Sequence, residues 1–125
     1  VTYPCTAHTL MIDFKVSTLL SFALVDNQNN LMAFGQCYER VKHCHLGRLI
    51  VAPEFRGKGL VAKLIDLLSI VGCREFNTDV CSLFVLKANN AAIKAYQRIG
   101  FELSDYPFEM PLDSCLYMTK PSIVI

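Results

Sequence analysis

The chain has 125 residues, of which 53% are hydrophobic and 18% are charged, and its formal net charge is +1. This length predicts a single domain over residues 1–125, and the hydrophobic fraction excludes a disordered chain. The near-neutral charge gives no broad electrostatic surface for nucleic acid or for an anionic membrane. Neither a run of ~20 apolar residues that could cross a bilayer nor a signal peptide is evident, so we expect a cytoplasmic protein.

The first half of the chain predicts one helix followed by an antiparallel meander. Thr6 can cap a helix over residues 7–16, which carries apolar side chains on one face. Three strands follow, each an apolar stretch bounded by polar turns: 19–25, 31–38 and 44–52. Pro53 ends the third strand, because proline cannot donate to a sheet ladder.

The second half begins with the clearest helix of the chain. Apolar residues recur at helical spacing over 60–71, and Gly72 is expected just beyond the end of this helix. Residues 80–86 form a continuous apolar strand, as expected where both faces of a sheet are covered. A strand, a helix and a further strand in this order predict a crossover, so strands 44–52 and 80–86 should be parallel.

A second helix is predicted over 89–99, with Asn89 as its cap and Gly100 at its end. Two last strands lie on either side of the proline-containing loop 105–113: 101–104 and 115–119. The predicted fold is an α+β (α/β mixed sheet) domain, in which an antiparallel meander is followed by a parallel crossover strand, with helices on both faces.

The segment between strand 44–52 and helix 60–71 predicts an anion site. A helix N-terminus offers unpaired backbone N–H groups and the positive end of the helix dipole. Gly57 and Gly59 let the backbone approach an anion closely, and Arg56 and Lys58 add positive charge. The alternative is an ordinary surface turn of basic and glycine residues.

Comparison with two known phosphate-binding motifs limits which phosphate ligand this segment could bind. The chain contains no Walker A sequence. Gly57 to Ala62 matches the Gly-x-Gly-x-x-Ala form of a dinucleotide site, and Asp79 follows about twenty residues later. However, the strand ends at Pro53, too far before Gly57 for the tight turn of that site, and a meander stands where that fold needs parallel strands. A dinucleotide site is therefore not expected.

Two segments resemble the motifs of one family. Val51-Ala-Pro53-Glu-Phe-Arg56-Gly57-Lys58-Gly59-Leu60-Val61 is similar to the acetyl-CoA-binding motif of the GNAT N-acetyltransferase superfamily, Arg/Gln-x-x-Gly-x-Gly/Ala after Val-x-Pro. Asn89-x-x-Ala92-Ile93-x-x-Tyr96-x-x-x-Gly100-Phe101 is similar to the second motif of that family. The order of elements agrees from residue 6 onward. Two departures are Val61 at a Gly/Ala position and a single short helix where the family has a strand and a helix before the first hairpin.

The resemblance implies acetyl-CoA as co-substrate. Its pyrophosphate would lie on the backbone N–H groups of Arg56, Gly57, Lys58, Gly59, Leu60 and Val61. Its pantetheine arm would pair with the backbone of Leu49, Ile50 and Val51, where strands 44–52 and 80–86 splay apart. An N–H group near Val51 would polarise the thioester carbonyl. Asn89 would bind the pantetheine or cap its own helix.

The resemblance also implies a general acid, Tyr96, which would protonate the departing CoA thiolate. The alternative for Tyr96 is a core aromatic residue at helical spacing. A protonated amine must lose a proton before it attacks, and the candidate bases are Glu39, His43 and His45. His45 is the best placed of these in the sequence, and a chain of water molecules could replace a base altogether.

The implied function is an N-acetyltransferase in which a primary amine attacks acetyl-CoA directly in a ternary complex. The acceptor would be a small-molecule or peptide amine, and loop 105–113 would border its pocket with acids and aromatics. Neither nucleic acid nor a membrane is expected as a partner, and exposed strand edges would suit a homodimer. A non-catalytic acyl-CoA-binding module on the same fold, and an acyltransferase for a longer acyl chain or a non-amine acceptor, are the alternatives.

The cysteines and histidines raise the question of a metal. Cys37, His43, Cys44 and His45 lie close together in the sequence, but consecutive residues on a strand point to opposite faces and cannot share one ion. No Cys-x-x-Cys pair occurs among the six cysteines. We therefore expect reduced core thiols and no metal.

Overall fold

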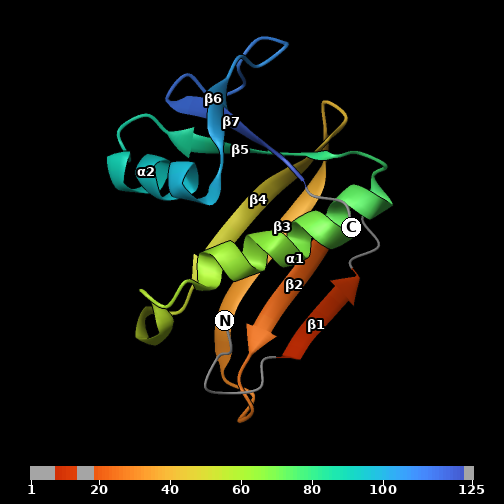
Figure 1. The fold of residues 1–125 in the computed structure, drawn as a ribbon, viewed down its shortest axis with the longest axis vertical. Coiled ribbons are helices and arrows are strands. Elements are labelled where there is room, and N and C mark those ends of the chain that lie inside the picture. Colours follow the sequence, from red (N-terminus) through yellow and green to blue (C-terminus); the bar gives the residue numbers. More distant parts are fainter. Residues whose placement is uncertain (1–7, 14–18, 123–125) are drawn as a thin grey trace.

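The structure is a computed structural model that describes residues 8–13 and 19–122. A seven-stranded mixed sheet has the order β1-β2-β3-β4-β5-β7-β6 (Figure 1). The strands are β1 His8–Asp13, β2 Leu20–Val25, β3 Leu31–Arg40, β4 His43–Val51, β5 Val80–Leu86, β6 Glu102–Ser104 and β7 Cys115–Pro121. The helices are α1 Leu60–Glu75 and α2 Asn90–Ile99, and a short 3-10 turn, η1, covers Pro53–Phe55. None of the helices in the described part of the chain is long and apolar enough to cross a membrane.

The expected helix over 7–16 is wrong where the structure describes it. His8–Asp13 forms β1, which pairs antiparallel with β2 along its whole length. The helical spacing of apolar residues competed here with the strand preference of the β-branched Thr9 and Ile12. Pairing with β2 gives the β1 backbone its hydrogen-bond partners. Thr6 and residues 14–16 lie outside the described residues.

The meander and the crossover are confirmed. β2, β3 and β4 pair antiparallel in sequence order. β4 and β5 pair in parallel, with Cys44, His45 and Leu46 opposite Cys81, Ser82 and Leu83. The second helix also ends as predicted, because Gly100 has a φ of 122°, which favours glycine.

Helix α1 does not end at Gly72 as expected but continues to Glu75. Gly72 lies where the helix packs against the sheet, and a Cβ atom there would lie 2.5 Å from Cys44 Sγ and 2.9 Å from Cys37 Sγ. Glycine is therefore required at this position for close packing, not for a turn. The residue that follows α1 is Phe76, whose N–H donates to the Gly72 carbonyl.

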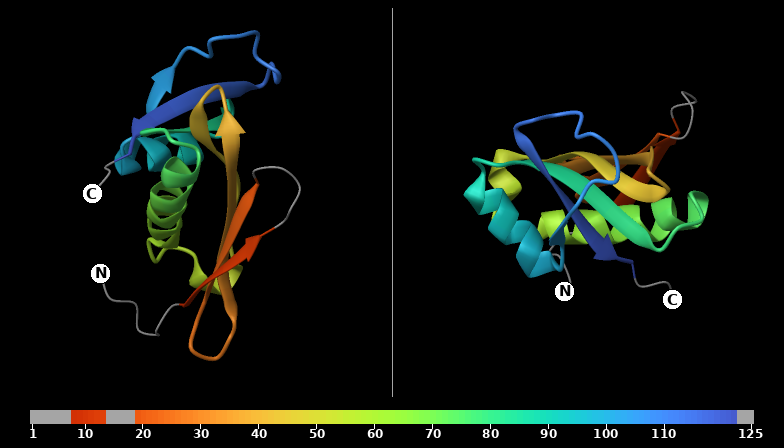
Figure 2. Two further views of the ribbon diagram at one scale, coloured as in Figure 1. Left: turned by 90° about the vertical axis from the view of Figure 1, so that its right-hand side faces the viewer. Right: turned by 90° about the horizontal axis from the view of Figure 1, so that it is seen from above.

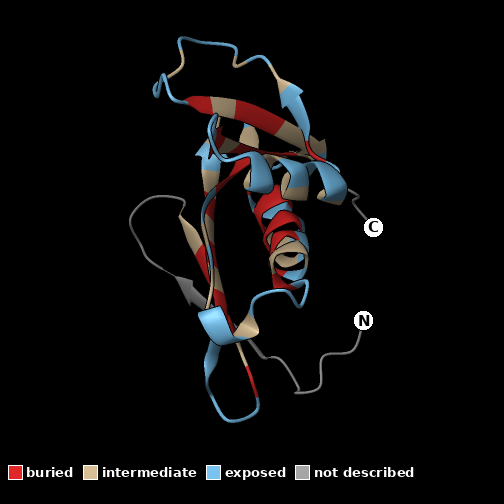
Figure 3. Cartoon of the chain, turned by 90° about the vertical axis from the view of Figure 1, so that its left-hand side faces the viewer, coloured by how far each residue is buried: buried red, intermediate tan, exposed pale blue. Residues whose placement is uncertain are grey.

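Both helices lie on the same face of the sheet in the described part of the chain (Figure 2). Helices on both faces were expected from the sequence, and for the described residues this expectation is wrong. The connections from β4 to β5 and from β5 to β6 step in the same direction across the sheet, and right-handed crossovers in one direction place their helices on one side. We call this side the helix face and the other side the open face. Buried residues lie along α1 and along the strands that it covers (Figure 3).

Candidate functional site

The site begins with a gap between β4 and β5. β4 runs to Val51, but its pairing with β5 ends at Leu46. In the pairing of β3 with β4, Gly35 faces Leu49 and Cys37 faces Leu46, so two β4 residues oppose one β3 residue. Such a bulge bends its strand and increases the local twist. Among the described residues, the edge of β4 that faces β5 is therefore left without a strand partner from residue 47 onward.

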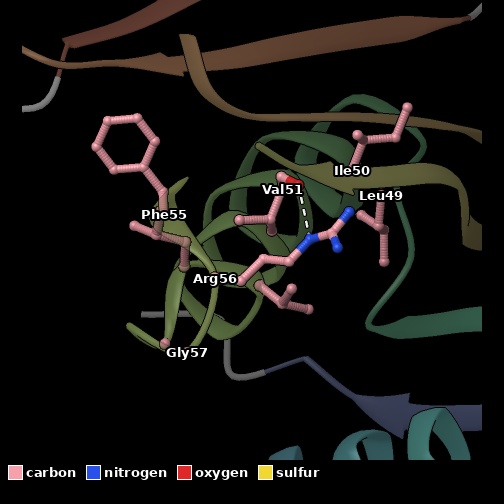
Figure 4. A pocket seen from close by; sticks show the side chains of 9 residues that line it. Leu49, Ile50, Val51, Phe55, Arg56 and Gly57 are labelled. Carbon is pink, nitrogen blue, oxygen red and sulfur yellow. Dashed lines mark hydrogen bonds between the residues drawn. The ribbon is translucent and has the colours of Figure 1, made fainter. Parts of the chain in front are cut away.

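A pocket with a volume of about 530 Å³ lies beside this unpaired end of β4 (Figure 4). Its walls come from the end of β4, from the turn after it and from the start of α1: Leu49, Ile50, Val51, Phe55, Arg56, Gly57, Gly59, Leu60 and Val61. Arg56 Nε donates to the Val51 carbonyl at 3.3 Å, which joins the turn to the strand. All the coenzyme-binding residues expected from the sequence line this pocket except Lys58 and Asn89.

The start of α1 is left open to a ligand. Gly57 and Gly59 have φ angles of 78° and 74°, and a Cβ atom on either would meet nothing within 4 Å. Gly59 is the N-cap residue, provides no side-chain cap, and the first turn holds no acidic residue. The N–H groups of the first turn therefore have no helical acceptor. With the helix dipole and the nearby Arg56, they form a site that favours an anion.

Two neighbours of this site differ from expectation. Phe55, which the sequence analysis did not single out, lines the pocket, and the Lys58 ammonium lies 5.6 Å from the centre of its ring. The only signal for Phe55 was an aromatic residue in the turn after a strand. Val61, the departure from the motif, packs partly against the core cluster of α1 and the sheet, so part of its β-branched side chain is turned away from the glycine turn.

Tyr96 and Asn89 lie on the second helical segment and are not among the pocket residues. Tyr96 is half-buried, and its ring packs edge-on against Phe101 with centroids 5.9 Å apart. Burial raises the pKa of Tyr96, which keeps its hydroxyl protonated at neutral pH. Asn89 Oδ1 accepts a hydrogen bond from the Ala92 N–H at 3.1 Å and so caps α2.

His45 lies on the open face and is only 2% exposed. Its Nδ1 atom is 2.8 Å from Ser82 Oγ, and its ring packs against Tyr38 and Phe84. Burial, with the charge of Arg40 as the second cause, lowers the pKa of His45 to about 4. An imidazole in this environment is a weak base that solvent does not reach, so its geometry does not favour the role of general base.

The open face carries an aromatic cluster that the sequence analysis did not assemble. Its members are Tyr38, His45, Phe84, Tyr106 and Tyr117, with ring centroids of neighbours 4.6–6.5 Å apart. Arg40 lies over this cluster, 5.3 Å from the ring centre of Phe84. Alternation along each strand could have placed some of these residues on one face, but only the sheet register and the path of the loop after β6 bring them together.

Three buried thiols lie in the core close enough to share an ion. The Sγ atoms of Cys44, Cys73 and Cys81 are all within 4.8 Å of one another. Hydrogen bonding to Cys37 raises the pKa of Cys44, and burial raises the pKa of Cys73 to about 11. A metal would bind the deprotonated thiolates, so this environment favours packed, protonated thiols. The group of Cys37, His43, Cys44 and His45, which the sequence argued against as a metal site, is divided between the two faces of the sheet, since Cys44 faces the core and His45 the open face.

Comparison with known proteins agrees with this geometry. The sequence model of the acetyltransferase (GNAT) family matches residues 3–101. The chain belongs to this family. The recognition from two sequence motifs is thereby confirmed, and so is the fold that it implied. The paiA N-acetyltransferase of Thermoplasma acidophilum, solved in complex with coenzyme A, superposes with a TM-score of 0.69 at 20% identity over 83% of this chain and 61% of that chain.

This GNAT-family chain matches its curated relatives over only part of their length. The catalytic subunit NAA20 of the N-terminal acetyltransferase B complex of Arabidopsis thaliana is 34% identical over 59 residues, which is 47% of this chain and 34% of that protein. The spermidine N(1)-acetyltransferase of Escherichia coli K12 is 34% identical over 56 residues, or 45% of this chain and 30% of that protein. The matched segments thus span about a third of each relative.

Proposed function

We propose that this protein is an N-acetyltransferase that transfers the acetyl group of acetyl-CoA to a primary amine by direct attack in a ternary complex. The observation that carries the proposal is the pocket that joins the uncapped start of α1 to the unpaired end of β4. One end of this pocket suits a phosphate, and the other offers a strand edge to an extended chain. A coenzyme that combines a pyrophosphate with an amide-containing arm fits both ends.

The roles in this proposal follow the geometry. The pyrophosphate lies against the N–H groups from Gly57 to Val61, and the pantetheine adds to the edge of β4 along Leu49, Ile50 and Val51. The amine nitrogen forms a C–N bond with the acetyl carbon, and the C–S bond breaks. A backbone N–H of this segment of β4 stabilises the oxyanion that forms between these events. Tyr96 gives its proton to the CoA thiolate. Because burial raises the pKa of Tyr96, its phenol is a weak acid, and this transfer requires the hydroxyl and the sulfur to lie close together.

The proton of the attacking amine goes to water in this proposal. His45 is enclosed by the aromatic cluster and hydrogen-bonded to Ser82. His43 Nδ1 is held 2.9 Å from the Tyr117 hydroxyl, and Glu39 is an exposed residue near the end of β3. None of the three lines the pocket. Water that enters through the gap between β4 and β5 is therefore the acceptor that the geometry favours.

The names of two relatives support an amine as the acceptor. One is named as a catalytic subunit for N-terminal acetylation and another as a spermidine acetyltransferase. Both names refer to transfer to a nitrogen. We extend this class, a primary amine, to the present chain.

The test is thermal unfolding with acetyl-CoA, followed by release of free CoA thiol in the presence of amines. Acetyl-CoA at about 100 times its Kd should stabilise the fold by about 2.7 kcal/mol, whereas NAD should leave the midpoint unchanged. Release of thiol that depends on an amine then establishes transfer. Stabilisation without amine-dependent thiol release would indicate a non-catalytic acyl-CoA-binding module, an outcome compatible with the absence of Tyr96 from the pocket walls. No stabilisation at all would refute the coenzyme site.

A further inference from the structure

The side chain of Arg40 is the best-positioned charge on the open face. It stands at the end of β3, and its guanidinium donates to two tyrosine hydroxyls. The distances are 3.3 Å from Nε to Tyr38 Oη and 3.0 Å from Nη1 to Tyr106 Oη. It also lies over the rings of Tyr38 and Phe84, at 5.6 Å and 5.3 Å from their centres. Four contacts thus fix the position of one guanidinium.

The charge of Arg40 has no acidic partner among the described residues. Hydrogen bonds with Tyr106 and then Tyr38 raise its pKa, and no carboxylate contributes to that shift. Asp105 and Glu109, two acids of the loop 105–113 that was expected to border the acceptor pocket, are both exposed. A guanidinium has five N–H donors in a planar fork, and the two tyrosines use only two of them. The remaining donors are sufficient for a carboxylate bound through both oxygens.

The Arg40 backbone pairs with His43 near the start of β4, and its side chain extends over the Phe84 ring, at the end of the pairing between β4 and β5. Phe84, under the guanidinium, directly follows Leu83, the last β5 residue that pairs with β4. Leu49, where the pocket begins, is three residues beyond the corresponding Leu46, a distance of about 10 Å along the strand. Strand alternation places Ile50 on the open face, where it is 55% exposed. An acceptor that approaches from this face would pass over apolar surface between the acetyl group and Arg40.

We infer that Arg40 binds a carboxylate of the acceptor, so that the acceptor is an amine that also carries a carboxylate and not a polyamine. This inference rests on the proposed function and specifies its substrate class. A second ammonium would be repelled by the guanidinium, whereas a carboxylate would complete its hydrogen bonds. The offset of about 10 Å along β4 between Leu46, the last residue paired with β5 beside Phe84, and Leu49 in the pocket suits an amine and a carboxylate joined by a short flexible chain or one peptide unit.

The experiment compares three acceptors of equal carbon number: ε-aminocaproate, ε-aminocaproamide and hexamethylenediamine. Their turnover with acetyl-CoA is measured as kcat/KM, and their binding to the protein is measured separately by calorimetry in the presence of CoA. The variant is Arg40→Gln. Arg74→Gln, an exposed position in the last turn of α1, removes the same charge and serves as the control. Thermal midpoints and CoA affinity of both variants are compared with those of the unchanged protein, to establish that they fold.

The expected result is a preference of about tenfold or more for the carboxylate over the carboxamide, the effect of one charge-assisted pair. This preference should fall to about one in Arg40→Gln and persist in Arg74→Gln. Equal turnover of all three acceptors would overturn the inference and leave the proposed function intact. Binding of the carboxylate that depends on Arg40 without any turnover would uphold the inference and refute the proposed function. If neither binding nor turnover distinguishes the three compounds, the inference is wrong.

Discussion

The two helices begin in opposite ways. At α2, the Asn89 side chain accepts a hydrogen bond from the Ala92 N–H, so the protein itself satisfies a free donor of the first turn. At α1, Gly59 offers no such acceptor, and no acid stands in the first turn. Every helix has the same unpaired N–H groups at its start. The start of α2 is therefore satisfied by the protein itself, whereas the start of α1 is available to a ligand.

The bodies of the two helices differ as well. α1 carries Leu64, Ile65 and Leu68, all fully buried against the sheet, whereas no residue of α2 is fully buried. The core therefore holds α1 in place along its length, independently of what happens at its first turn. Changes at the start of α1 should thus affect ligand binding more than folding, and changes at the start of α2 should do the reverse.

The largest effect should come from closing the open start of α1. Gly59→Glu places a carboxylate where the proposal puts the pyrophosphate, and we expect acetyl-CoA affinity to fall by more than about 100-fold. Gly59→Ala is the matched control, since it imposes the same left-handed strain of about 1–2 kcal/mol on the backbone and adds only a methyl group without charge. Calorimetry should show that Gly59→Ala retains most of the affinity. Equal losses in the two variants would mean that backbone strain, not a phosphate site, governs binding.

The second-largest effect should come from Tyr96, in the body of α2. Tyr96→Phe removes the proposed acid while it preserves the ring contact with Phe101. We expect kcat to fall by about 100-fold, the lower end of what general acid catalysis contributes, with acetyl-CoA affinity unchanged. The measurement is steady-state thiol release together with calorimetry. A variant as fast as the unchanged protein would assign Tyr96 to packing alone and remove the acid from the proposed mechanism.

A smaller effect should appear where α1 meets the sheet. Gly72→Ala adds a methyl group 2.5 Å from Cys44 Sγ, and such overpacking should lower the free energy of unfolding by about 1–3 kcal/mol. Gly47→Ala is the control, since its added Cβ would have only ordinary contacts, the nearest at 3.5 Å from the Tyr38 ring. Denaturant titration of both variants measures the difference. If the two variants are equally stable, α1 packs against Cys44 less tightly than the distance of 2.5 Å indicates.

The glycines at the two ends of α1 also show what the sequence could predict. Gly57 and Gly59 were expected in a turn that needs glycine, and both have a positive φ, because their local motif between a strand and a helix determines their backbone. Gly72 was interpreted as a helix end, although it serves a contact with residues about thirty positions away in the chain. Local motifs predicted the pocket, and apolar periodicity predicted the crossover. Contacts that depend on strand register were not accessible in this way.

The same distinction explains three other discrepancies. His8–Asp13 contains both a helical spacing of apolar residues and β-branched residues, and pairing with β2, which is a tertiary interaction, decides between them. The aromatic cluster combines Tyr38, Phe84 and Tyr106 from three distant segments. His45 was expected near the reacting groups because of its place in the sequence, at the start of strand 44–52. Its side chain instead faces the aromatic cluster, since a strand directs alternate side chains to opposite faces.

The smallest effect should come from the capped start of α2, and it tests the comparison most directly. Asn89→Ala removes the acceptor for the Ala92 N–H and should lower the free energy of unfolding by about 1 kcal/mol. Asn89→Asp keeps an oxygen acceptor in the same place and should retain the stability. If Asn89 serves only as a cap, both variants should bind acetyl-CoA as the unchanged protein does. A loss of affinity in both variants, with stability retained in Asn89→Asp, would mean that the amide also contacts the pantetheine. The start of α2 would then belong to the binding site as well.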